Sequence, residues 1–169
     1  MNIQPGDWAV GPIGGPGGVA IGVAEMIANG FRFEPWEHAL VYIGHGKILQ
    51  AEPGREGAQI RPLSSVPEHF IWSTGILRNP NTDEESAFAL GKQLEHTPYS
   101  ALDYFALAAL HAHIPYPHLR KFIEAEGHMQ CAQLVDFYEL KRGWHLFTDH
   151  RQPGDVMPYD LGRLLVRSA

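Results

Sequence analysis

Three kinds of side chain in this sequence could together carry out nucleophilic acyl transfer. Cys131 is the single cysteine of 169 residues, and a thiolate is the nucleophile of such chemistry. His38 carries an imidazole that could take the thiol proton, and a polar side chain such as Gln50 or Glu52 could orient that imidazole. We therefore predict a catalytic site of Cys131, His38 and a third polar residue that attacks a carbonyl carbon and forms a thioester.

The stretch HALVYIGHGKILQA, residues 38–51, is expected to position two of these side chains. An apolar run with β-branched and aromatic residues, a Gly-His-Gly turn and a second apolar run predict a β-hairpin. Strand side chains alternate between faces, so His38 and the even-numbered Gln50 and Glu52 can share one face. The hairpin alone leaves open which of the two polar residues orients His38.

A predicted helix over residues 131–142 is expected to position the nucleophile. Its apolar stripe includes Cys131 and Tyr138, which indicates an amphipathic helix, and Gly143 is a typical stop signal. Cys131 stands at the helix start, where the helix dipole favours a thiolate and backbone N–H groups could stabilise an oxyanion. The alternative is that Cys131 is a small core residue, as most unpaired cysteines are.

The remaining pattern indicates one α+β domain over residues 1–169, with helices packed on an antiparallel sheet. Strands are predicted mainly early and helices mainly late. Further strands are expected at residues 8–10, 58–63 and 71–77. Further helices are expected at residues 19–28, 84–95, 100–112, 119–126 and 160–166, the second of them capped by Thr82 or Asp83.

Composition excludes several classes of function. A formal net charge of -6 without a basic cluster argues against a nucleic-acid partner. No apolar stretch is long enough for an integral membrane segment, and the first residues lack the pattern of a signal peptide. We therefore expect a cytoplasmic protein as synthesised, released or virion-associated if it is phage-encoded. The sequence does not indicate an oligomeric state.

Two other patterns are set aside, and no cofactor or metal is expected. Four histidines lie between residues 111 and 128 and could suggest a metal site. No second cysteine and no acidic residue stands near them at the spacing of zinc ligands. The glycines around Gly15 match a dinucleotide-binding loop in part, but Pro16 interrupts the pattern and no βαβ unit follows.

The hairpin stretch resembles the histidine strand of NlpC-like, papain-fold cysteine peptidases. In that family the catalytic histidine falls on His38, and the third, orienting residue falls on Gln50, directly before Ala51. Ordinary members place the cysteine helix before this hairpin, whereas here Cys131 follows it. The order resembles the circularly permuted branch of the superfamily, in which a tyrosine segment, here Tyr99, and the cysteine helix come last.

Two departures from the family pattern concern the site. Ala132 replaces the small hydroxyl residue that usually follows the cysteine, so a hydrogen bond from that hydroxyl is absent. Glu52 is a rival orienter of His38, although the family spacing favours Gln50. Tyr99 is expected to support the site or to pack in the core, and Trp36, close to His38 in sequence, is expected in the substrate cleft.

The resemblance implies a cysteine peptidase or amidase that cleaves an amide bond, with peptidoglycan peptides as the substrate class. Permuted relatives include lipid-directed acyl hydrolases and acyltransferases that pass through the same thioester, so an acyl substrate is the first alternative. A non-catalytic binding module or phage structural part on the same scaffold is the second. The sequence leaves the substrate and the bond that is cleaved open.

Overall fold

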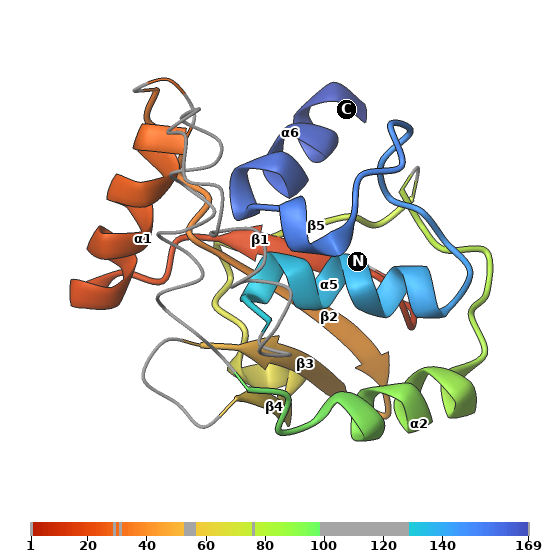
Figure 1. Cartoon of the computed structure of the whole chain (residues 1–169). Coiled ribbons are helices and arrows are strands. Elements are labelled where there is room, and N and C mark those ends of the chain that lie inside the picture. The colour runs from red at the N-terminus through yellow and green to blue at the C-terminus, as the bar shows by residue number, and fades with distance from the viewer. Residues whose placement is uncertain are drawn as a thin grey trace.

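A single antiparallel sheet organises the chain in the computed structural model, which describes residues 2–28, 30, 32–52, 57–75, 77–98 and 129–168. Its strands lie in the order β4-β3-β2-β1-β5 (Figure 1). Their bounds are Trp8–Gly11 for β1, His38–Gly44 for β2, Lys47–Ala51 for β3, Ala58–Pro62 for β4 and Ile71–Trp72 for β5.

The predicted hairpin is confirmed as β2 and β3. Leu40 pairs with Gln50 across the two strands, so the end of β3 lies opposite the beginning of β2. The turn residues His45 and Gly46 have φ angles of 51° and 65°. Positive φ at both central positions is the geometry of a tight type I′ hairpin turn, which glycine adopts without strain.

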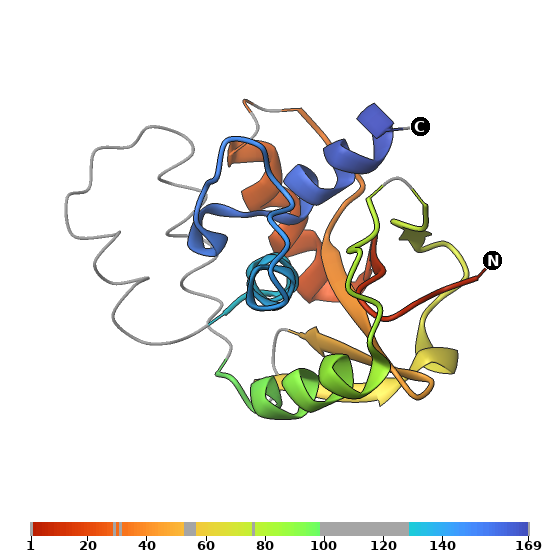
Figure 2. The same cartoon turned by 90° about the vertical axis from the view of Figure 1, so that its right-hand side faces the viewer.

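Four α-helices fall within the described residues: α1 Gly15–Ala28, α2 Glu84–Leu94, α5 Cys131–Lys141 and α6 Pro158–Ser168. Short 3₁₀ helices cover Leu63–Ser65 and Pro153–Asp155. Helices α5 and α2 pack against β2, and α6 contacts both β1 and α5 (Figure 2). The predicted α+β class, with helices on an antiparallel sheet, is therefore confirmed.

The alternation of β2 divides the core into two parts. Ala39, Val41 and Ile43 belong to the larger buried cluster, which also contains Cys131 and the apolar residues of α5. Leu40 belongs to a smaller cluster on the other face, which includes Phe70. The sheet is thus apolar on both faces, and the larger core lies under the helices.

Helix α5 differs from the predicted amphipathic helix, although its bounds agree closely. All of its residues from Cys131 to Asp136 are buried, and so are Tyr138 and Glu139. The reason is that β2 and β3 cover one side while α6 and the Pro153–Asp155 segment cover the other. One of its buried polar side chains, Glu139, accepts a hydrogen bond of 2.6 Å from Asn79 through Oε2.

Three predicted elements had wrong boundaries. Helix α1 begins at Gly15 rather than residue 19, because Pro16 is compatible with the first turn of a helix. Strand β5 ends at Trp72, since a turn follows in which Gly75 has a φ of 100°. Helix α6 begins at Pro158 and ends at Ser168, so it is longer than predicted.

Some expectations lie outside the described residues. These are the helices predicted at residues 100–112 and 119–126, the histidines between them, and Tyr99. Within the part of the chain that is described, no helix is both long enough and apolar enough to cross a membrane.

Candidate active site

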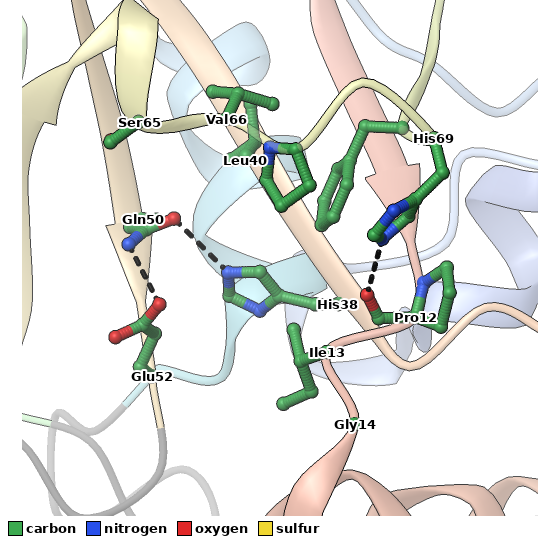
Figure 3. A pocket seen from close by; sticks show the side chains of 12 residues that line it. Pro12, Ile13, Gly14, His38, Leu40, Gln50, Glu52, Ser65, Val66 and His69 are labelled. Atoms are coloured by element: carbon green, nitrogen blue, oxygen red, sulfur yellow. Dashed lines mark hydrogen bonds between the residues drawn. The ribbon is translucent and has the colours of Figure 1, made fainter.

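His38 is the first residue of β2 and is 1% exposed. Its Nε2 atom lies 3.3 Å from Oε1 of Gln50 on the neighbouring strand β3 (Figure 3). The two residues meet because the hairpin register brings the end of β3 beside the start of β2. The predicted cross-strand contact between His38 and Gln50 is therefore present in the structure.

Glu52 contacts Gln50 rather than the imidazole. Nε2 of Gln50 donates a hydrogen bond of 2.9 Å to Oε1 of Glu52, which follows the end of β3. The three side chains form a continuous row across the two strands, from imidazole to amide to carboxylate (Figure 3). The two rival orienters are thus arranged in series, with Gln50 next to His38.

Burial dominates the electrostatics of His38. Desolvation of the ring lowers its pKa, because an imidazolium is poorly stabilised away from water. The hydrogen bond with Gln50 and the negative charge of Glu52 raise the pKa but do not overcome this effect. At neutral pH His38 is accordingly an uncharged imidazole, which is the form that can accept a proton.

The second ring nitrogen of His38 has a different environment. Nδ1 is buried and has no hydrogen-bond partner among the described residues. The edge of the ring faces Phe70, with the two ring centroids 6.2 Å apart and an angle of 79° between the planes. A buried, unpartnered ring nitrogen is uncommon in a folded protein and is one of the features found at catalytic sites.

Cys131 is the first residue of α5 and is 1% exposed. Its helix packs against β2 and β3, and Cys131 shares the larger buried cluster with Ala39 and Ala51. Strand side chains alternate between faces, so His38 and Gln50, the sequence neighbours of these alanines, lie on the other face of the sheet. Helix α5 lies in front of β2 in the view of Figure 1 and contacts it. The residues that line the pocket beside His38 do not include Cys131, so the described structure brings His38 and Gln50 together but does not place Cys131 with them.

The residue before the cysteine carries a second buried polar group. Gln130 is fully buried, and in the part of the chain that the structure describes neither Oε1 nor Nε2 of its amide has a hydrogen-bond partner. Its backbone N–H donates to Oε1 of Gln133 at 3.1 Å, so Gln133 caps the start of α5. The side chain of Gln133 also donates to the carbonyl of Gly154 at 2.9 Å.

A pocket of about 400 Å³ lies beside His38 (Figure 3). His38, Gln50 and Glu52 form its polar wall, and most of the remaining surface is apolar. The residues that complete the lining are Pro12, Ile13, Gly14, Leu40, Ser65, Val66, Pro67, His69 and Phe70. Its size and its mixture of apolar walls with a few polar groups are typical of sites for small ligands or substrate side chains.

Two residues that the sequence did not single out shape the rim of this pocket. Oε2 of Glu37 accepts hydrogen bonds from the backbone of Ile13 and Gly14, at 3.0 and 3.3 Å, which fixes the loop before α1. Nε2 of His69 lies 3.1 Å from the carbonyl oxygen of Pro12 and joins two sides of the rim. Only the position of Glu37 directly before His38 could have drawn attention to it.

Trp36 lies next to α6 rather than in the pocket lining. Its ring is so close to Gly162 of that helix that a Cβ atom there would stand 2.4 Å from Cδ1 of Trp36. The residues that line the pocket beside His38 do not include Trp36. Its assignment to a substrate cleft stays a prediction, and so does the role of Tyr99.

Comparison with known proteins gives this chain no relative. No family model, no curated protein and no solved structure matches its sequence or fold.

Proposed function

We propose that this chain is a cysteine-dependent hydrolase of amide bonds, with Cys131 as nucleophile, His38 as base and Gln50 as the residue that orients His38. We further propose that it has the circularly permuted NlpC-like order, with the histidine hairpin before the cysteine helix. The observation that carries the proposal is the buried contact of 3.3 Å between His38 and Gln50, which is the contact expected between a base and the residue that orients it. A peptidoglycan peptide is the substrate class that the resemblance implies.

The proposed reaction uses the residues in a fixed order. His38 takes the proton of the Cys131 thiol, and the thiolate attacks the carbonyl carbon of the amide. Backbone N–H groups at the start of α5 stabilise the negative oxygen of the tetrahedral intermediate. The C–N bond then breaks as His38 gives its proton to the leaving amine. Water, deprotonated by His38, hydrolyses the resulting thioester and releases the acid.

Substitution of the two central residues tests the proposal directly. We expect that Cys131→Ala and His38→Ala each abolish hydrolysis of peptidoglycan stem peptides while circular dichroism shows a folded protein. His69→Ala is the matched control, because His69 lines the same pocket but its ring contacts the carbonyl of Pro12. Mass spectrometry should detect an acyl adduct on Cys131 in the parent protein. Full turnover by the Cys131→Ala protein would end the proposal.

An acyl hydrolase or acyltransferase is the second candidate function, and the lining of the pocket favours it. Pro12, Ile13, Leu40, Val66 and Phe70 make the pocket mainly apolar, and its described lining includes no Lys or Arg. Such a surface suits an uncharged acyl chain better than an acidic peptide, whose carboxylates would lose their hydration. Labelling Cys131 with an acyl-ester probe and with a peptide probe of equal reactivity discriminates between the two candidates.

A further inference from the structure

We infer that Glu52 is a positioning residue, which fixes the side-chain amide of Gln50 and thereby the tautomer of His38. This inference rests on the proposed function, because a fixed tautomer matters only if His38 exchanges protons. It assigns to Glu52 a role that neither Gln50 nor His38 can supply alone.

The contact with Glu52 determines the orientation of the Gln50 amide. An amide side chain can accept through its oxygen or donate through its nitrogen, and the two ends are nearly the same size. An ionised carboxylate can only accept hydrogen bonds. Glu52 lies 2.9 Å from one end of the Gln50 amide, so that end must be the NH₂ group. The amide oxygen is then held toward His38.

The orientation of the Gln50 amide in turn determines the tautomer of the His38 imidazole. The oxygen of Gln50 faces Nε2 of His38 at 3.3 Å, and an amide oxygen only accepts. Nε2 must therefore carry the hydrogen of the neutral ring. The other nitrogen, Nδ1, is then the basic atom with a lone pair, and it is the buried ring nitrogen for which the described residues supply no partner.

Without Glu52, the Gln50 amide could adopt either of its two orientations. Gln50 is 8% exposed, so water has little access to correct a reversed amide. A reversed amide would present its NH₂ group to Nε2, which would favour the tautomer with hydrogen on Nδ1. That tautomer cannot take the thiol proton through Nδ1. Glu52 disfavours the reversed amide, because the amide oxygen would then face a carboxylate and neither group could donate a hydrogen bond to the other.

Nitrogen NMR of the His38 imidazole tests the inference without any substrate. The chemical shifts of the two ring nitrogens show which one carries hydrogen, and comparison with a His38→Ala sample identifies the His38 signals. We expect hydrogen on Nε2 in the parent protein at a pH above the pKa of His38. Hydrogen on Nδ1 in the parent protein would overturn the inference.

Three variants make the test specific. Glu52→Lys places a donor-only group beside Gln50, so the amide should reverse and the hydrogen of His38 should move to Nδ1. The double variant Gln50→Glu with Glu52→Gln exchanges the two groups and should keep hydrogen on Nε2, because the carboxylate then at position 50 accepts from both neighbours. Glu68→Lys makes the same change of charge at an exposed residue of a neighbouring surface pocket and should leave the tautomer unchanged.

Activity measurements separate this inference from the proposed function. Glu52→Lys should reduce kcat by about 10²- to 10⁴-fold with a smaller change in KM, as expected when a catalytic histidine has the wrong tautomer. The double variant should recover most of this loss. A folded Glu52→Lys protein with an unchanged tautomer overturns the inference even if hydrolysis depends on Cys131. A changed tautomer supports it even if hydrolysis does not depend on Cys131.

Discussion

At the scale of single residues, the side chains proposed for catalysis are almost completely buried. His38 and Cys131 are each 1% exposed, and Gln50 is 8% exposed. Burial of such groups opposes folding unless partners compensate for the lost hydration. The contact of 3.3 Å between His38 and Gln50 is longer than an ordinary N–H···O bond, as is common for catalytic hydrogen bonds in unliganded proteins.

If His38 is the base of the proposed hydrolase, Gln50→Leu should change the pH dependence of hydrolysis. The hydrogen bond that His38 donates to Gln50 raises the pKa of His38, so its removal should lower that pKa further and extend the neutral form to lower pH. The loss of orientation should reduce kcat/KM at neutral pH by about 10- to 100-fold. The acidic limb of the pH–rate profile should move to lower pH. A limb that moves to higher pH would contradict the prediction that Gln50 stabilises the protonated form of His38.

Gln130→Leu should increase the stability of the fold. Both polar atoms of the Gln130 amide are buried and lack a partner within the described ranges of the chain. Replacing such a group by an apolar one of similar size should raise the free energy of unfolding by roughly 1 to 3 kcal/mol. Urea denaturation measures the change. Gln133→Leu is the control and should destabilise, because Gln133 bonds the backbone of both Gln130 and Gly154.

At the scale of elements, local signals predicted the parts that depend on neighbours in sequence. The hairpin follows from the glycines on either side of His45, and the end of α5 follows from Gly143, whose φ is 81°. Asp83 caps α2 as its residue type indicates, by accepting from the backbone of Ser86 at 2.9 Å. These features depend on a few adjacent residues, so their sequence is sufficient to indicate them.

Features that depend on distant residues were not predicted. The burial of α5 on both sides results from α6 and the Pro153–Asp155 segment, which periodicity within α5 cannot reveal. The contact between His69 and Pro12 joins residues 57 positions apart. The structure shows that Gln50 contacts His38 and that Glu52 contacts Gln50. The alternation of the hairpin residues alone left both Gln50 and Glu52 possible as the partner of His38. The positions of His38 and Gln50 were predictable because one hairpin contains both.

Helix α2 approaches β2 closely at Gly91, and Gly91→Ala tests that approach. A Cβ atom at Gly91 would lie 2.7 Å from Cδ1 and 3.2 Å from Cβ of Ile43, which is fully buried. Alanine is favoured over glycine inside a helix by about 1 kcal/mol. Overpacking in a dense core costs about 1 to 3 kcal/mol, and the β-branched Ile43 has few rotamers for relief.

We therefore expect Gly91→Ala to lower the melting temperature, despite the better helix propensity of alanine. Gly22→Ala in α1 is the control, because a Cβ atom there would lie 3.4 Å from Oε1 of Glu37, which is an ordinary contact distance. That variant should stabilise the protein by up to about 1 kcal/mol. An increase in melting temperature for both variants would show that Ile43 yields without strain.

At the scale of the whole molecule, α5 holds acidic side chains in the interior of the fold. Burial raises the pKa of Asp136 to about 7 and the pKa of Glu139 to about 7. Glu139 is held by Asn79 and lies 3.7 Å from Nη1 of Arg142 at the end of the helix. Removing Glu139 would leave a buried cation with fewer partners, so Asp136 gives the clearer test of how burial of acids affects stability.

The raised pKa of Asp136 predicts a loss of stability as pH rises. The unfolded carboxyl titrates near 3.8 and the folded one near 7, so the folded state binds a proton more tightly between these values. The stabilisation is complete below about pH 4, decreases as pH rises to about 7 and is then absent. Asp136→Asn removes this titration, so the variant should be more stable than the parent protein at about pH 8.5.

The expected gain is roughly 2 to 4 kcal/mol at about pH 8.5 and close to zero at about pH 4, from about 1.4 kcal/mol for each pKa unit. Urea denaturation at the two pH values measures it. Asp83→Asn should show the opposite pH dependence. Hydrogen bonds with Ser86 lower the pKa of Asp83, so the stability that its carboxylate contributes is lost as pH falls. Parallel stability curves for the parent and Asp136→Asn proteins would contradict the prediction. The positive charge of Arg151, which lowers the pKa of Asp136, would then offset the cost of burying the ionised carboxyl group.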